Sequence, residues 1–105
     1  MRKALPLLAA LLVLGAGCGT GGKAASGDQQ NGSKLFTEKC AGCHTLKAAA
    51  AAGTIGPNLD QLKPSQAVVQ HQVEVGGGVM PAFKGKLSPA QITAVAKFVS
   101  SSAGK

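Results

Sequence analysis

Two cysteines and a histidine fall within five consecutive residues, Cys40-Ala41-Gly42-Cys43-His44. On one helical turn, two thiols three residues apart can each add to a vinyl group on one edge of a haem, and the adjacent imidazole then lies within reach of the iron. The spacing Cys-x-x-Cys-His is the attachment signature of c-type haem. This pentapeptide therefore predicts a fold built around one covalently bound haem c.

The chain is too small to form a large core by itself. It has 105 residues, of which 3% are aromatic, and it lacks Trp and Tyr. This length excludes a multidomain enzyme, and so small a core is marginal unless a metal, disulfides or a cofactor completes it. All of the aromatic bulk comes from Phe36, Phe83 and Phe98.

Three other interpretations of the pentapeptide compete with haem attachment. A thioredoxin-like dithiol belongs beside a strand and a helix of a βαβ unit, and the sequence shows no convincing strand. A structural zinc site needs four ligands, for which only His71 and Cys18 remain. A simple disulfide leaves both His44 and the missing core volume unexplained. Haem attachment explains both the histidine and the small core.

The first 17 residues have the organisation of a secretory signal. Arg2 and Lys3 are basic, residues 5–14 are almost entirely apolar, and residues 15–17 are small. The apolar run is well short of the ~20 residues that span a bilayer as a helix. We therefore expect residues 1–17 to be removed on export, and we expect no permanent transmembrane helix.

Small residues directly before Cys18 resemble a bacterial lipobox, in which that cysteine is lipidated and becomes the new N-terminus. The pattern departs from the usual one because Gly15 stands where Leu is common. The alternative is ordinary cleavage, which leaves a free thiol in an exported protein. We expect a lipid-anchored Cys18 and a flexible Gly/Ala/Ser tether over residues 18–27, then a folded domain over residues 28–103. Its location is the periplasm or the extracytoplasmic face of a membrane.

The charge of the exported chain favours a protein partner. From Cys18 onward there are nine lysines, no arginine and four acidic residues, a formal charge of +5. Without arginine, tyrosine or tryptophan, nucleic-acid binding is disfavoured. Lysines suit a weak, salt-sensitive encounter with an acidic surface.

Amphipathic helices frame the predicted domain, which we assign to the all-α class. Asp28 is the expected N-cap of a first helix that runs to about Lys39, with Leu35 and Phe36 on one face. A shorter helix follows Pro64-Ser65 and ends at residues 76–78. Its expected inward residues are Val68, Val69, Val73 and Val75.

The last helix has the clearest sequence signals. Ser88-Pro89-Ala90-Gln91 is a capping box with Pro at the first helical position, and Leu87 precedes it as half of a hydrophobic staple. Apolar residues then recur at helical spacing, which predicts one buried face. This face consists of Ile92, Val95, Ala96 and Val99, with Phe98 beside them.

A haem iron held by His44 needs a second axial ligand or an open position. Met80 is the only methionine after the signal, and it lies between a triple-glycine segment and Pro81. The 36 residues that separate it from His44 suffice to wrap around the haem. His71 is the rival ligand, although its place between two glutamines favours a solvent-facing side chain.

Gly56-Pro57-Asn58-Leu59 is the remaining motif that bears on the haem site. A metal-bound histidine usually donates its other ring N–H to a carbonyl or carboxylate, which orients the ring and tunes its basicity. Because proline stiffens this loop, the Pro57 carbonyl is the expected acceptor for His44.

Taken in order, these motifs resemble a class I cytochrome c of the short bacterial and photosynthetic kind, over about residues 28–101. The resemblance implies a fold of three to five helices wrapped around one covalent haem, and a close crossing of the first and last helices. It also implies the site residues. Cys40 and Cys43 would form the thioethers, His44 and Met80 would be the axial ligands, and Pro57 would orient His44.

A six-coordinate haem has no open site, so the resemblance implies a monomeric one-electron carrier and not an enzyme. Its redox partners would dock on an exposed haem edge. The lysines expected to rim that edge are Lys39, Lys47, Lys84 and Lys86. Two alternatives remain: a haem-based redox or gas sensor with a displaceable Met80, and a zinc or disulfide module without haem.

Overall fold

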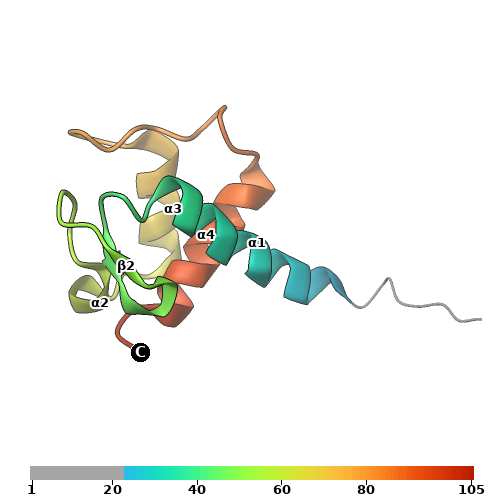
Figure 1. Cartoon of the computed structure of the whole chain (residues 1–105). Coiled ribbons are helices and arrows are strands. Elements are labelled where there is room, and N and C mark those ends of the chain that lie inside the picture. The colour runs from blue at the N-terminus through green and yellow to red at the C-terminus, as the bar shows by residue number, and fades with distance from the viewer. Residues whose placement is uncertain (1–22) are drawn as a thin grey trace, which may run out of the picture.

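The computed structural model describes residues 23–105, and these residues form a small helical domain with one short two-stranded ribbon (Figure 1). The predicted signal and Cys18 lie outside the described residues. No helix between residues 23 and 105 has the length and apolar character to cross a membrane. The elements are α1 (Lys23–Lys39), β1 (Thr45–Leu46), the 3-10 turn η1 (Lys47–Ala49), β2 (Ala51–Ala52), α2 (Leu59–Leu62), α3 (Gln66–Val75) and α4 (Pro89–Ser102).

Helix α1 ends at Lys39 as predicted, but it begins at Lys23 and not near Asp28. The prediction of Asp28 as the N-cap was wrong because the preceding residues include Ala24 and Ala25, and alanine has the highest helix propensity. Asp28 therefore lies inside the helix. The helix extends into the segment that we expected to be tether.

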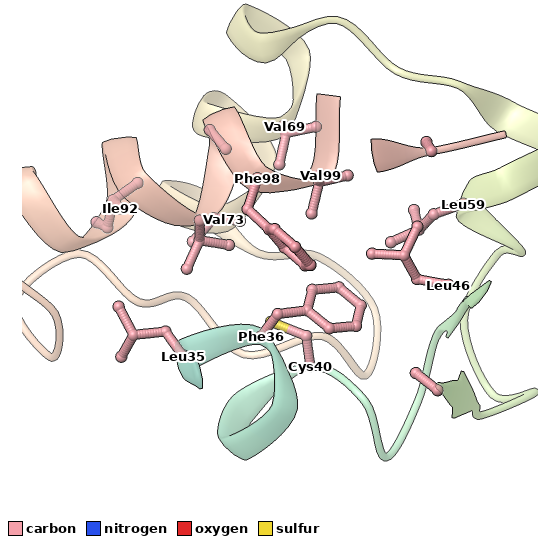
Figure 2. Packing of buried hydrophobic residues seen from close by; sticks show 14 of the residues in the cluster. Leu35, Phe36, Cys40, Leu46, Leu59, Val69, Val73, Ile92, Phe98 and Val99 are labelled. Carbon is pink, nitrogen blue, oxygen red and sulfur yellow. The ribbon is translucent and has the colours of Figure 1, made fainter. Parts of the chain in front are cut away.

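Helices α1 and α4 cross closely, and this contact forms the centre of the core (Figures 1 and 2). Gly32 lies against the backbone of Ala94, and a Cβ atom at Gly32 would overlap the carbonyl oxygen of Ala94. One turn further on, the rings of Phe36 and Phe98 pack with centroids 5.9 Å apart and planes tilted by 56°. The predicted crossing is confirmed, and its cause is the missing side chain at Gly32.

Helix α4 follows its sequence signals. The Ser88 hydroxyl accepts the N–H of Gln91, and the Gln91 side chain accepts the N–H of Ser88, so the capping box is complete. The predicted apolar face is buried, and Val95 and Ala96 are at most 1% exposed. Local sequence and tertiary packing agree along this helix.

Helix α3 begins after Ser65, whose hydroxyl accepts the N–H of Val68, and ends at Gly76. Val69 and Val73 are buried against α4, as expected. The expectation that Val68 and Val75 also face inward was wrong, because both are more than half exposed. Residues 69 and 73 share one face of the helix, whereas residues 68 and 75 lie to one side of it.

The structure also contains short elements that the sequence did not predict. Strands β1 and β2 pair in an antiparallel ribbon around Ala50, which has a left-handed backbone with φ of 52°. Helix α2 is one turn long and is capped by the Asn58 side chain. Leu46 of β1 and Leu59 of α2 close one end of the core (Figure 2). These elements support the cavity described next.

Candidate haem-binding site

A cavity of about 420 Å³ lies between the end of α1, the loop over residues 53–58, helix α3 and the segment over residues 76–83. Its volume falls in the ~300–1,000 Å³ range of ligand pockets. All of the residues that the sequence analysis assigned to a haem line it: Cys40, Cys43, His44, Pro57 and Met80. The cavity therefore brings together residues that are up to 40 positions apart in the chain.

The walls of the cavity are mainly apolar, and several of their side chains are left uncovered by the protein. Ile55 is 67% exposed, Leu62 57%, Val68 59% and Val79 80%. All four line the cavity. Apolar surface of this extent, gathered around one hollow, needs an apolar occupant to remove it from water. The residues present thus fit a haem, whose ring would cover these side chains.

The two thiols lie at the end of α1, on the turn that continues it. Backbone N–H groups of Cys43 and His44 both donate to the Cys40 carbonyl, at 3.1 Å each, so the pentapeptide is folded as a compact turn. Cys40 and Cys43 are not joined in a disulfide. Burial, and then the neighbouring Cys43, raises the pKa of the Cys40 thiol to about 11. Burial therefore does not give Cys40 the lowered thiol pKa on which thioredoxin-like chemistry relies.

The imidazole of His44 is held by the loop that follows β2. Its Nδ1 lies 2.8 Å from the Pro57 carbonyl oxygen. Because a carbonyl only accepts, Nδ1 donates in this hydrogen bond, and Nε2 is the ring atom that remains for a metal. Gly56 lies close to the ring: a Cβ atom there would come within 2.6 Å of Cε1. The loop therefore both orients the imidazole and lets the chain pass close to it.

Met80 lies at the end of a tight turn built from glycines. Gly77 and Met80 pair through reciprocal backbone hydrogen bonds of 2.9 Å. Gly76 and Gly78 have φ values of 65° and 58°, a left-handed conformation that glycine adopts without strain. Met80 is partly buried and packs against the core while lining the cavity. The rival ligand His71 is exposed on α3 and does not line the cavity.

The structure separates the four lysines that we expected around a haem edge. Lys39 lines the cavity. Lys84 and Lys86 are exposed on the turn that follows the lining residue Phe83. Lys47 begins η1 and does not line the cavity.

The sequence analysis missed two residues of the apolar cavity walls, Ile55 and Leu62. Ile55 and Leu62 stand alone among polar or turn-forming residues, without any periodicity that would mark them as buried. The available signal was an unexplained apolar residue in a Gly/Pro loop. Asp60 was also missed, although its carboxylate joins three parts of the chain.

Comparisons with known proteins agree with this geometry. The family profile described as "Cytochrome C oxidase, cbb3-type, subunit III" matches residues 27–99. Cytochrome c6 of Picosynechococcus sp. is 35% identical, with 98% of this chain and 96% of that protein covered. Cytochrome c6 of Leptolyngbya boryana is 37% identical, with 74% and 96% covered.

A solved structure shows the same fold. The c-type cytochrome SorU from Sinorhizobium meliloti superimposes with a TM-score of 0.71 at 44% sequence identity. The match covers 76% of this chain and 95% of that one. The helical arrangement thus has a counterpart in a solved protein.

Proposed function

Since this chain belongs to the class I cytochrome c family and carries one covalently bound haem c, we propose that it is a one-electron carrier with His44 and Met80 as the axial ligands of the iron. Cys40 and Cys43 form the two thioethers. The observation that carries the proposal is the cavity, which gathers all four of these side chains among apolar walls.

The state of His44 supports its role as a ligand. Its Nδ1–H donates to the Pro57 carbonyl, which leaves Nε2 as the ring atom that can bind a metal and raises the basicity of the ring. The close approach of Gly56 limits the space around the ring. Pro57 acts as a positioning residue, because it fixes the orientation of the imidazole before any metal is bound.

Met80 is favoured over His71 by position. It lines the cavity, whereas His71 points to solvent on α3. When bound, haem supplies a one-electron couple, and methionine ligation gives it a higher potential than a second histidine would. With both axial positions filled by the protein, the chain has no site at which a substrate reaches the iron, so we assign it no enzymatic activity.

The mouth of the cavity supplies a docking surface. Val79 is 80% exposed, and Pro81 and Ala82 beside it are exposed as well. Lys39 lines the cavity, and Lys84 and Lys86 are exposed on the turn that follows the lining residue Phe83. Apolar contact at the centre with lysines around it suits brief encounters with acidic redox partners. We assign the chain a monomeric state.

The N-terminal sequence supports export and anchoring. The signal over residues 1–17 directs the chain across a membrane, and lipidation of Cys18 holds it at the extracytoplasmic face. Two or more acyl chains are needed for a stable anchor. The mature protein then works in the periplasm or at the membrane surface.

Replacing Met80 tests the ligand assignment. In Met80→Ala the iron loses its sulfur ligand, so the weak sulfur–iron band of the oxidised spectrum disappears and the potential falls. The matched control is His71→Ala, for which both properties stay at wild-type values. If Met80→Ala kept the wild-type spectrum and His71→Ala changed it, the assignment would have to be reversed.

Carbon monoxide binding to the wild-type protein separates an electron carrier from a sensor. In the wild-type protein, a carrier keeps Met80 bound in both oxidation states, and added carbon monoxide leaves the reduced spectrum unchanged. Rapid displacement of Met80 by carbon monoxide in the wild type would instead favour the sensor.

A further inference from the structure

The Asp60 carboxylate receives two backbone N–H groups from distant parts of the chain. Oδ2 accepts the N–H of Lys47 at 2.8 Å, and Oδ1 accepts the N–H of Gly104 at 2.8 Å. Each carboxylate oxygen therefore has its own donor. Hydrogen bonds to an ionised acceptor are about twice as strong as neutral ones. Asp60 thus ties α2 to η1 on one side and to the C-terminal turn on the other.

The arm to Lys47 belongs to a row of contacts between two segments that run side by side. The segment over residues 44–47 carries His44, and the segment over residues 57–60 carries its acceptor. His44 Nδ1 donates to the Pro57 carbonyl at 2.8 Å. Thr45 and Asn58 form a parallel bridge. Asp60 then closes the row at Lys47, three residues beyond His44.

We propose that Asp60 is a positioning residue for the His44 imidazole, acting through the register between these two segments. The inference rests on the proposed role of His44 as a haem ligand. If the hydrogen bond between the Lys47 N–H and Asp60 is lost, the segment that carries the Pro57 carbonyl can shift relative to the His44 ring. The Nδ1–H bond then weakens and the imidazole becomes less basic.

This role predicts an effect on the iron that a purely stabilising contact would lack. A less basic imidazole stabilises ferric iron less well, so the reduction potential moves to a more positive value. At the same time the Nδ1 proton of His44 exchanges faster with solvent. The arm to Gly104 contacts the end of α4 and the Lys63 side chain, away from the row. Its loss should lower stability without changing either property.

The two arms can be cut separately. Lys47→Pro removes the N–H donor while leaving Asp60 intact. Proline is tolerated here, since Lys47 is the first residue of η1 and Leu46 before it is extended, with φ of −154° and ψ of 108°. Lys47→Ala is the matched control, because it loses the charge but keeps the N–H. Removal of residues 104–105 cuts the other arm.

The experiment uses the haem-loaded protein. We would measure the reduction potential by redox titration and the exchange of the His44 Nδ1 proton by NMR in the reduced state. Asp60→Asn and Lys47→Pro should both show a more positive potential and faster exchange. Lys47→Ala and the truncated chain should match the wild type in both.

Wild-type potential and exchange in Asp60→Asn and Lys47→Pro would overturn the inference. So would equal changes in the truncated chain, because Asp60 would then act only through stability. Failure of the proposed function looks different: the wild-type protein itself would lack covalent haem or a histidine-ligated iron. If Asp60→Asn does not fold, the comparison of Lys47→Pro with Lys47→Ala decides alone.

Discussion

The helical side of the molecule and the cavity side are packed in different ways. Where α1 meets α4, Phe36 is 1% exposed and Val99 2%, so protein atoms alone bury them. Around the cavity, Ile55 and Val79 remain 67% and 80% exposed. The helical side is completed by the chain, and the cavity side by the haem. A small chain can therefore use a cofactor in place of the aromatic residues that it lacks.

Removing both thiols should have the largest effect on this division. In Cys40→Ala/Cys43→Ala the haem cannot be attached, so the cavity side loses the group that covers its apolar walls. We expect no haem on denaturing gels and rapid amide exchange over residues 53–58 and 76–83. Helical circular dichroism should persist in part, because α1 and α4 still contact each other. If amide protection were lost equally on both sides, or kept equally on both sides, the two sides would not be packed in different ways.

Truncating the core of the helical side should be the next largest change. Phe98→Ala removes the ring that packs on Phe36 and should cost about 3–5 kcal/mol of unfolding free energy. Chemical denaturation of the haem-loaded protein measures this loss. The reduction potential should stay near the wild-type value, since Phe98 does not line the cavity. A large change in potential with little loss of stability would show that the two sides are not separate.

Shortening an apolar side chain of the cavity wall should lower the unfolding free energy only when haem is present. Ile55→Ala removes an apolar wall that the protein leaves exposed, so it should cost about 1 kcal/mol in the haem-loaded chain and close to nothing in the haem-free chain. Denaturation of both forms measures the difference. An equal cost in the two forms would mean that Ile55 is covered by protein and not by the cofactor.

Acid should weaken the two hydrogen bonds that the Asp60 carboxylate accepts, because it protonates that carboxylate. Backbone hydrogen bonds from Gly104 and then Lys47 hold the pKa of the Asp60 carboxyl below its usual value of 3.8. A lowered pKa stabilises the fold above the unfolded value, and this contribution is lost as the pH falls through the folded pKa. Unfolding free energy should therefore fall less steeply below about pH 4 in Asp60→Asn. Identical slopes would show that Asp60 does not contribute.

Replacing surface lysines should have the smallest effect, and the effect on association rate should differ between the two sides. Lys84→Gln/Lys86→Gln should slow association with an acidic redox partner and flatten its dependence on salt, because these lysines flank the cavity mouth. Lys97→Gln, on the outer face of α4, is the control and should change neither. Stopped-flow kinetics over a range of ionic strength tests this. If Lys97→Gln, which removes one charge, gave half the effect of the double variant, which removes two, only net charge would matter.

The sequence predicted the helical side better than the cavity side, for physical reasons. The capping box at Ser88 and the apolar spacing along α4 are local signals that packing reinforces. Strands of two residues and a one-turn helix are too short to show any period. The start of α1 was missed because Ala24 and Ala25 continue the helix before any capping residue.

The candidate site divides in the same way. Its chemical groups were predictable, since Cys40, His44 and Met80 stand in motifs whose spacing reflects how a haem is held. Its walls were not, because Val68 and Ile55 acquire their role only when α3 and the loop after β2 meet around one cavity. The link from Asp60 to Gly104 spans 44 residues, a separation at which local sequence carries no information.

The visible spectrum of the full-length protein tests the central claim most directly. The protein should be made in a host that exports it and attaches haem, then measured oxidised and after reduction with dithionite, with a haem stain after denaturation. We expect haem that survives denaturation, sharp α and β bands in the reduced state, and a weak sulfur–iron band in the oxidised state. A colourless protein with free or bridged thiols at Cys40 and Cys43 would contradict the account.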